Sequence, residues 1–109
     1  MRNAATISEL KTDISNLDLL IDCSGVNREW NKINQYLQFG VRKILVSAPI
    51  KDKRILNIVY GVNHELYDHS KHNIITAASC TTNCLAPVVK VLDEKVGIKH
   101  GSISTIHNL

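Results

Sequence analysis

The chain has 109 residues, of which 44% are hydrophobic, and this composition is ordinary for one small globular domain. Its formal net charge is only +3, with lysine and arginine scattered between acidic residues, so no nucleic-acid partner is expected. No apolar run approaches the roughly 18 residues of a membrane span, and an odd count of three cysteines without a secretory signal favours a reducing, cytoplasmic setting.

The N-terminal part of the chain predicts one buried strand. Residues 1–16 have no firm period, and only a loop or a short helix near residues 8–11 is expected there. The compact apolar run 17–22 has the pattern of a buried parallel strand, and Gly25 allows the sharp turn at its C-terminal end.

A helix is predicted over 27–38, because large apolar residues recur on one face at Trp30, Ile33 and Leu37. We interpret these residues as a core stripe. Gly40 is placed to end the helix in a left-handed turn, and residues 43–47 predict a second buried strand. The order strand, helix, strand is a crossover unit, which implies parallel strands with the helix packed on the sheet.

The rest of the chain predicts two further strands, a second helix and a last strand. The pattern predicts a third strand over 55–60, a turn at 61–64, a polar connection over 65–72 and a fourth strand over 73–77. Apolar residues after Cys80 recur at three- and four-residue intervals, which predicts a helix to about Val96. Residues 101–107 place apolar residues among small polar ones and predict a partly buried strand.

Cys80 is the candidate nucleophile. Ser79 is a natural N-cap, which puts Cys80 in the first turn of the helix, where unpaired N–H groups and the helix dipole favour a thiolate. A histidine that takes the thiol proton would activate the cysteine for attack on a carbonyl, and His107 is the candidate. From these two residues alone, a buried small thiol and a surface histidine remain the competing interpretation.

The neighbours of Cys80 carry a more specific signal. In one-letter code the stretch Ala78–Pro87 is ASCTTNCLAP, which resembles the active-site signature of the phosphorylating glyceraldehyde-3-phosphate dehydrogenases. Four shorter stretches are similar to motifs of that family and follow in the same order, at 22–25, 47–49, 61–64 and 105–107. The resemblance extends from about Leu17 to the end of the chain.

This resemblance implies an NAD-dependent aldehyde dehydrogenase that forms an acyl phosphate. The family's cysteine, matched by Cys80, attacks the aldehyde of glyceraldehyde 3-phosphate, and the resulting thiohemiacetal loses hydride to become a thioester. The family's histidine, matched by His107, deprotonates the thiol and then acts as acid or base on the substrate oxygen. Inorganic phosphate releases the acyl group.

The resemblance also implies binding residues. Ser79 and Thr81 match residues that bind the attacking phosphate, a task that suits hydroxyls and N–H groups at a helix start. Ser24, Gly25 and Ser47 match NAD contacts at the carboxyl ends of strands. The acidic residue that separates NAD from NADP is missing, so NADP stays open. The parent enzyme is expected to be a homotetramer.

The implied fold is α/β, with a partial Rossmann-like parallel sheet that runs into the first helix and strand of an α+β catalytic domain. Residues 1–79 would be the C-terminal part of the NAD(P)-binding domain and 80–109 the start of the catalytic domain, both incomplete. The family's Gly-rich phosphate loop and nearly everything after its histidine are absent. We therefore expect little or no dehydrogenase activity from the isolated chain.

Two alternatives stay open. Asn108 and Leu109 differ from the residues common after the histidine in the glycolytic enzymes, which would suit a related dehydrogenase for erythrose 4-phosphate or for arsenate-linked chemistry. A protein of another class, a non-catalytic thiol module that senses oxidants or binds full-length subunits, would use Cys80 together with Cys84 one helical turn away.

The other cysteines and histidines are expected to be structural. Cys84 is interpreted mainly as helix packing, and Cys23 as a small residue under the sheet. The remaining histidines have no ligand-like spacing, so we expect surface positions and no metal for His64, His69, His72 and His100.

Overall fold

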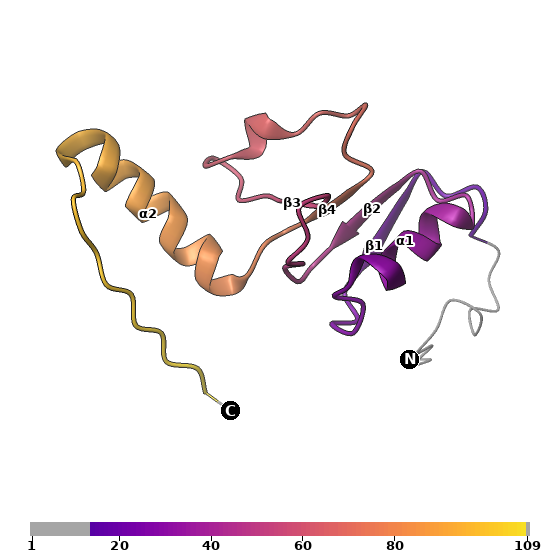
Figure 1. Ribbon diagram of the computed structural model, residues 1–109, viewed down its shortest axis with the longest axis horizontal. Coiled ribbons are helices and arrows are strands. Elements are labelled where there is room, and N and C mark those ends of the chain that lie inside the picture. The colour runs from indigo at the N-terminus through magenta and orange to yellow at the C-terminus, as the bar shows by residue number, and fades with distance from the viewer. Residues whose placement is uncertain (1–13, 109) are drawn as a thin grey trace.

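The computed structural model describes residues 14–108, which contain two α-helices and four strands (Figure 1). In chain order the elements are β1 (Leu19–Asp22), α1 (Trp30–Gln38), β2 (Lys43–Val46), β3 (Leu56–Asn57), β4 (Ile74–Thr76) and α2 (Cys80–Val96). A single 3₁₀ turn at His64–Leu66 lies between β3 and β4. The short helix considered near residues 8–11 falls outside the described residues.

The strands form one parallel sheet in the order β1-β2-β4-β3. β1 and β2 are neighbours, and α1 is the crossover between them. Hydrogen bonds continue past the strand ends, because the Ser47 N–H donates to the Asp22 carbonyl and the Ala77 N–H to the Val46 carbonyl, each at 2.9 Å. The prediction of an α/β fold with a parallel sheet is confirmed.

The core lies between α1 and one face of the sheet. Ile33 of α1, Ile44 of β2 and Ile74 of β4 are at most 2% exposed, and Trp30 and Leu37 pack against the same cluster. Removing each isoleucine side chain from water stabilises the fold by roughly 1.5–3 kcal/mol. The stripe predicted on the first helix is therefore part of the core.

A glycine with a positive φ follows each helix, as predicted for Gly40. Gly40 follows α1 with φ +96° and Gly97 follows α2 with φ +79°, a region that residues with a Cβ rarely adopt. At Gly40 a Cβ would also collide with the backbone of Ser15, so space as well as conformation requires glycine there.

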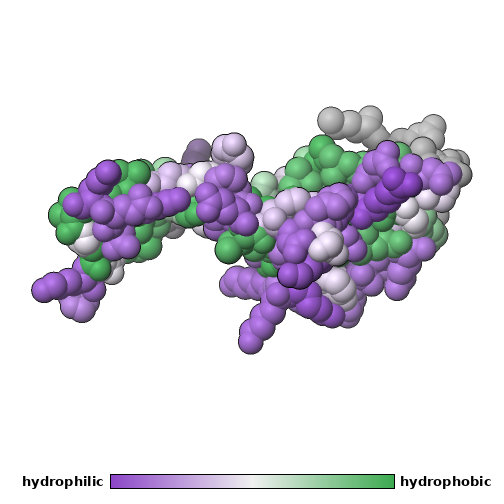
Figure 2. Space-filling model, turned by 90° about the horizontal axis from the view of Figure 1, so that it is seen from above, coloured by the Kyte–Doolittle hydropathy of each residue, from purple (hydrophilic) through white to green (hydrophobic). Residues whose placement is uncertain are grey.

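The second helix, α2, leaves the sheet after β4 and stands apart from it, so the molecule has two lobes (Figure 1). A hydrogen bond connects the two lobes, because the Lys90 ammonium of α2 donates to the Gly61 carbonyl at 2.9 Å. Figure 2 shows apolar surface on both lobes, and large exposed apolar side chains on α2 are Val88, Val89, Val91, Leu92 and Val96. Within residues 14–108, neither helix combines the length and apolarity needed to cross a bilayer.

Several details of the prediction are wrong. The first strand is less buried than predicted, because Leu19 and Ile21 of β1 are 54% and 58% exposed. Residues 101–107 form no strand: the segment is exposed, and no described strand lies beside it to complete a ladder. Cys23 is exposed and not under the sheet, because β1 has already ended at Asp22. β3 is also shorter than the predicted strand over 55–60.

Candidate functional site

The chain turns abruptly between β4 and α2, and Cys80 is the first residue of the helix after the turn. Ala78 in this turn has φ +57° and is 4% exposed, and among residues 14–108 it is the one non-glycine residue with a positive φ. The left-handed conformation costs a residue with a Cβ on the order of 1 kcal/mol, so its surroundings must hold Ala78 there. Strained strand-to-helix turns are a known way to present a nucleophile.

Side chains hold this turn from both sides. The Ala78 N–H donates to the Thr76 hydroxyl at 3.0 Å, and that hydroxyl donates to Asn57 Oδ1 at 2.6 Å. From the helix side, the Asn83 amide donates to two carbonyls that flank Ala78, at 2.7 and 2.9 Å. The direction in which the chain enters α2 therefore depends on three side chains outside the turn itself.

Ser79 caps α2, as predicted. Its hydroxyl accepts the Thr82 N–H at 3.0 Å and pairs with the Thr82 hydroxyl at 2.7 Å. Such a cap typically stabilises a helix by about 1 kcal/mol. Cys80 and Thr81 follow in the first turn, where free N–H groups and the helix dipole favour negative charge, and Cys80 is exposed.

Cys80 and His107 line the same groove, which lies between the start of α2 and the returning segment 103–107. The groove has a volume of about 470 Å³, and Thr81 and Cys84 also line it. Cys84 is exposed here instead of packing in a core. In the part of the chain that the structure describes, no hydrogen bond joins the Cys80 thiol to the His107 ring. The predicted pair therefore shares a groove without direct bonding.

At the end of β1, the Asp22 carboxylate organises the turn that carries Ser24 and Gly25. It is 6% exposed and accepts the Ser24 N–H at 2.8 Å, the Ser24 hydroxyl at 2.6 Å and the Asn27 amide at 2.7 Å. Gly25 has φ +74° in this turn. The Asn27 amide also donates to the Tyr36 hydroxyl at 3.2 Å, and burial, followed by the charge of Asp22, raises the pKa of Tyr36.

Ser47 follows β2 and is exposed next to that turn, since its N–H donates to the Asp22 carbonyl. The structure thus brings Ser24, Gly25 and Ser47 to the carboxyl edge of the sheet, where ligands of open parallel sheets bind. Cys80 follows β4 and lies beyond the same edge. No hydrogen bond within residues 14–108 joins these three residues to the groove.

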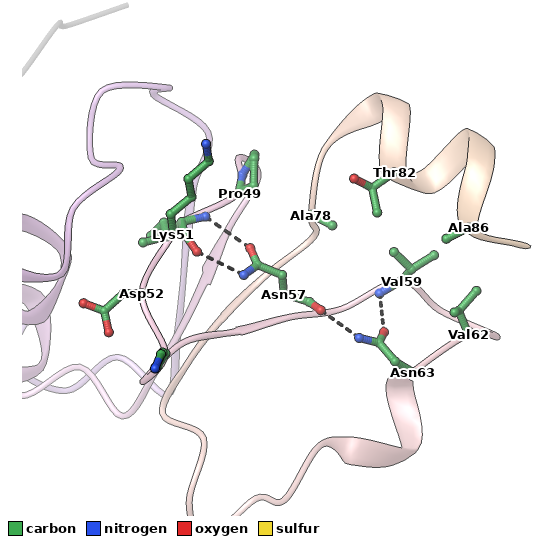
Figure 3. A pocket seen from close by; sticks show the side chains of 12 residues that line it. Pro49, Lys51, Asp52, Asn57, Val59, Val62, Asn63, Ala78, Thr82 and Ala86 are labelled. Carbon is green, nitrogen blue, oxygen red and sulfur yellow. Dashed lines mark hydrogen bonds between the residues drawn. The ribbon is translucent and has the colours of Figure 1, made fainter. Parts of the chain in front are cut away.

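A second cavity, also about 470 Å³, is lined by Ala78 of the strand-to-helix turn and by Thr82 and Ala86 of α2 (Figure 3). Its walls come from the loop 49–53, from residues 57–63 and from the start of α2. Figure 3 shows Asn57 among them, its amide paired with the Ile50 backbone at 3.1 and 3.0 Å. The described lining contains no cysteine or histidine, so this cavity is distinct from the thiol groove.

Sequence reasoning missed Asn57, Thr76 and Asn83. Asn57 had one available signal, because an amide inside an apolar run must find partners when the run is buried. Thr76 and Asn83 gave none, since only the folded chain shows which backbone groups a hydroxyl in β4 or an amide in α2 reaches.

The other histidines have local roles or lie at the surface. His64 Nδ1 accepts the Gly61 N–H at 3.0 Å, and His72 Nδ1 accepts the Asp68 N–H at 2.9 Å. Both rings are half-buried, whereas the two remaining histidines outside the groove are exposed. Among residues 14–108, no three side chains of the histidine, cysteine, aspartate or glutamate types gather as metal ligands.

Fold and site together define a class: an α/β protein with a parallel sheet, in which a strained turn leads from a strand to a helix that begins with an exposed cysteine. Residues 79–109 match the family described as glyceraldehyde 3-phosphate dehydrogenase, C-terminal domain.

Named relatives match most of the chain. It is 55% identical over 92 residues to glyceraldehyde-3-phosphate dehydrogenase 3 of Nostoc sp. strain PCC 7120, a match that covers 84% of this chain and 27% of that protein. It is 45% identical over 107 residues to the glyceraldehyde-3-phosphate dehydrogenase of Pseudomonas aeruginosa, covering 98% of this chain and 30% of that protein. Glyceraldehyde-3-phosphate dehydrogenase 2 of Caenorhabditis elegans is 41% identical over 105 residues, with 96% and 30% covered. These matches support a fragment of the glyceraldehyde-3-phosphate dehydrogenase family, and the chain spans less than a third of the length of these relatives.

Proposed function

We propose that the chain supplies the catalytic cysteine and histidine of a phosphorylating, NAD-dependent glyceraldehyde-3-phosphate dehydrogenase. The observation that carries this proposal is the groove shared by Cys80 and His107, inside the stretch that matches the family. In this assignment residues 1–79 belong to the cofactor domain and residues 80–109 begin the catalytic domain. Because the chain spans less than a third of its relatives, we expect little or no dehydrogenase activity from it alone.

Cys80 would act as the nucleophile and His107 as the acid and base. The thiol at the helix start would give its proton to the imidazole and add to the aldehyde carbon, which forms a thiohemiacetal. His107 would then exchange a proton with the substrate oxygen while the carbon loses hydride, which leaves a thioester on Cys80. Inorganic phosphate would displace the thiol and leave as the acyl phosphate.

Small residues at the carboxyl edge of the sheet fit one side of NAD, which when bound would supply the hydride acceptor. Gly25 has no side chain to keep a ligand from the backbone, and Ser24 and Ser47 are exposed beside it. Ser79 and Thr81 would bind the attacking phosphate. Since the Ser79 hydroxyl already caps the helix, the N–H groups of the first turn would supply much of that binding.

A chimera tests the proposal. The stretch of the Pseudomonas aeruginosa relative that matches this chain is replaced by the chain, and NAD reduction is measured with glyceraldehyde 3-phosphate and phosphate. We expect activity that Cys80→Ser abolishes and that His107→Asn lowers by about 100-fold or more. The matched controls Cys23→Ser and Cys84→Ser should stay active.

Activity that survives Cys80→Ser, or a folded chimera without activity, would contradict the proposal. Assays with erythrose 4-phosphate, or with arsenate in place of phosphate, test the related dehydrogenases. The same assay on the isolated chain tests its expected inactivity, which a rate abolished by Cys80→Ser would overturn.

The exposure of Cys80 and Cys84 in one groove supports a second candidate, a non-catalytic thiol module. Cysteines one helical turn apart lie within the Cα separation that a disulfide requires. Hydrogen peroxide would oxidise Cys80 to a sulfenic acid and be reduced to water, and the Cys84 thiol would then form the disulfide with loss of a second water. Peptide mapping after peroxide treatment should find this bridge, and its absence would remove the candidate.

A further inference from the structure

The turn before Cys80 depends on a chain of hydrogen bonds that starts at Asn57, at the end of β3. Asn57 Oδ1 accepts the Ile50 N–H at 3.1 Å and the Thr76 hydroxyl at 2.6 Å, while its Nδ2 donates to the Ile50 carbonyl at 3.0 Å. The backbone carbonyl of Asn57 accepts the Asn63 amide at 2.9 Å (Figure 3). Asn57 is therefore a fixed anchor for Thr76.

Thr76 passes this restraint to the turn. It has no exposed surface, and its hydroxyl accepts the N–H of Ala78, which is 4% exposed. Without that hydroxyl, the buried N–H would lose its partner and Asn57 Oδ1 would lose a donor. The simplest relief is rotation of Ala78 out of its left-handed conformation, which would change the direction in which the chain enters α2.

We propose that Asn57 and Thr76 are positioning residues for Cys80, which hold Ala78 in the left-handed conformation and so fix how the first turn of α2 presents the thiol. Neither side chain lines the groove that Cys80 shares with His107, so both act through the turn. The catalytic consequence rests on the proposed function, whereas the control of the thiol by the turn does not.

The test is alkylation of the 109-residue chain by iodoacetamide over a series of pH values, read by peptide mass spectrometry. Cys84 lies on the same helix and is exposed, so it serves as the internal reference. The variants are Thr76→Val and Asn57→Ala, each alone and combined with Ala78→Gly, with Thr76→Ser and Ala78→Gly as controls. Glycine adopts a positive φ without strain, so Ala78→Gly removes the need for the restraint.

We expect Thr76→Val and Asn57→Ala to lower the alkylation rate of Cys80 relative to Cys84 by about fivefold or more, and to shift the pH profile of Cys80 alone. Thr76→Ser keeps the hydroxyl, and the two glycine doubles remove the strain, so all three should remain within about twofold of the parent chain. A ratio that stays unchanged or rises, or a double variant that is not rescued, overturns the proposal.

Circular dichroism identifies variants that do not fold. Asn57 is only half-buried, so if Thr76→Val unfolds the chain, Asn57→Ala and its glycine double decide the outcome. Alkylation needs neither NAD nor substrate. An inactive chimera together with the expected alkylation pattern would therefore remove the proposed function and leave this inference standing, whereas an active chimera with unchanged alkylation would remove only the inference.

Discussion

Asp22 allows a stability prediction, because three hydrogen bonds converge on its nearly buried carboxylate. The substitution Asp22→Ala would leave the Ser24 N–H, the Ser24 hydroxyl and the Asn27 amide without this acceptor. A hydrogen bond to a charged group contributes about 1.5–3 kcal/mol, and donors at this edge of the sheet can turn partly to water. The expected loss of unfolding free energy is therefore about 2–4 kcal/mol, which is less than the sum of three bonds.

Urea unfolding followed by circular dichroism measures this loss. With a slope of about 2 kcal/mol per molar urea, the midpoint should fall by about 1–2 M. Asp22→Asn keeps one acceptor oxygen and should lose about half as much free energy. Gln35→Ala, at an exposed position of α1, is the control and should change the free energy by less than about 0.5 kcal/mol. Equal midpoints for Asp22→Ala and Gln35→Ala would refute the reasoning, because water would then replace all three bonds at no cost.

Three further outcomes follow from the same contacts. Ser79→Ala should cost about 1 kcal/mol and appear as faster amide exchange in the first turn of α2, with Ser79→Asp restoring protection; equal exchange in all three chains would contradict the cap. Burial and the charge of Asp22 raise the pKa of Tyr36, so the stability that the neutral phenol contributes is complete below about pH 10 and is lost as the pH rises through the raised pKa. Urea midpoints measured at rising pH should therefore fall for the parent chain, and should fall less for Tyr36→Phe. Hydrogen bonds from Arg54 lower the pKa of Asp52 to about 2, so the stability that these bonds contribute is present above about pH 4 and is lost as the pH falls through about 2. Arg54→Gln should raise this pKa toward 3.8 in a carboxyl NMR titration, and an unchanged pKa would exclude the Arg54 side chain as the cause.

The first helix and the second strand could be predicted because apolar residues of both face the core. The spacing of Trp30, Ile33 and Leu37 places all three on the face of α1 that meets the sheet, and the apolar run 43–47 matches β2 to within a residue. Gly40 and Gly97 end their helices with positive φ, as glycine after an amphipathic helix indicates. These are local signals, and the structure agrees with each of them.

The failures occur where an element needs a partner that the sequence does not name. Residues 101–107 have the composition of a strand, but a strand also needs a neighbour, and the described sheet ends at β3 on one side and β1 on the other. The third strand is short because the side chain of Asn57 pairs with the backbone of Ile50, and the carbonyl of Asn57 accepts from the amide of Asn63. Composition describes which face a strand would bury, and not whether a partner is present.

The candidate site also combines local features that could be predicted from the sequence with tertiary features that could not. Ser79 as cap and Cys80 at the helix start could be predicted, because capping is local. That His107 shares the groove with Cys80 depends on the path of the chain after α2, which no periodicity describes. The strained turn could not be predicted, because an alanine in the sequence does not indicate a positive φ. The strain of about 1 kcal/mol at Ala78 is offset by side chains that come from other elements. A residue held against its own preference can be recognised only from the groups that hold it, so the conformation that directs the thiol is a tertiary property and not a local one.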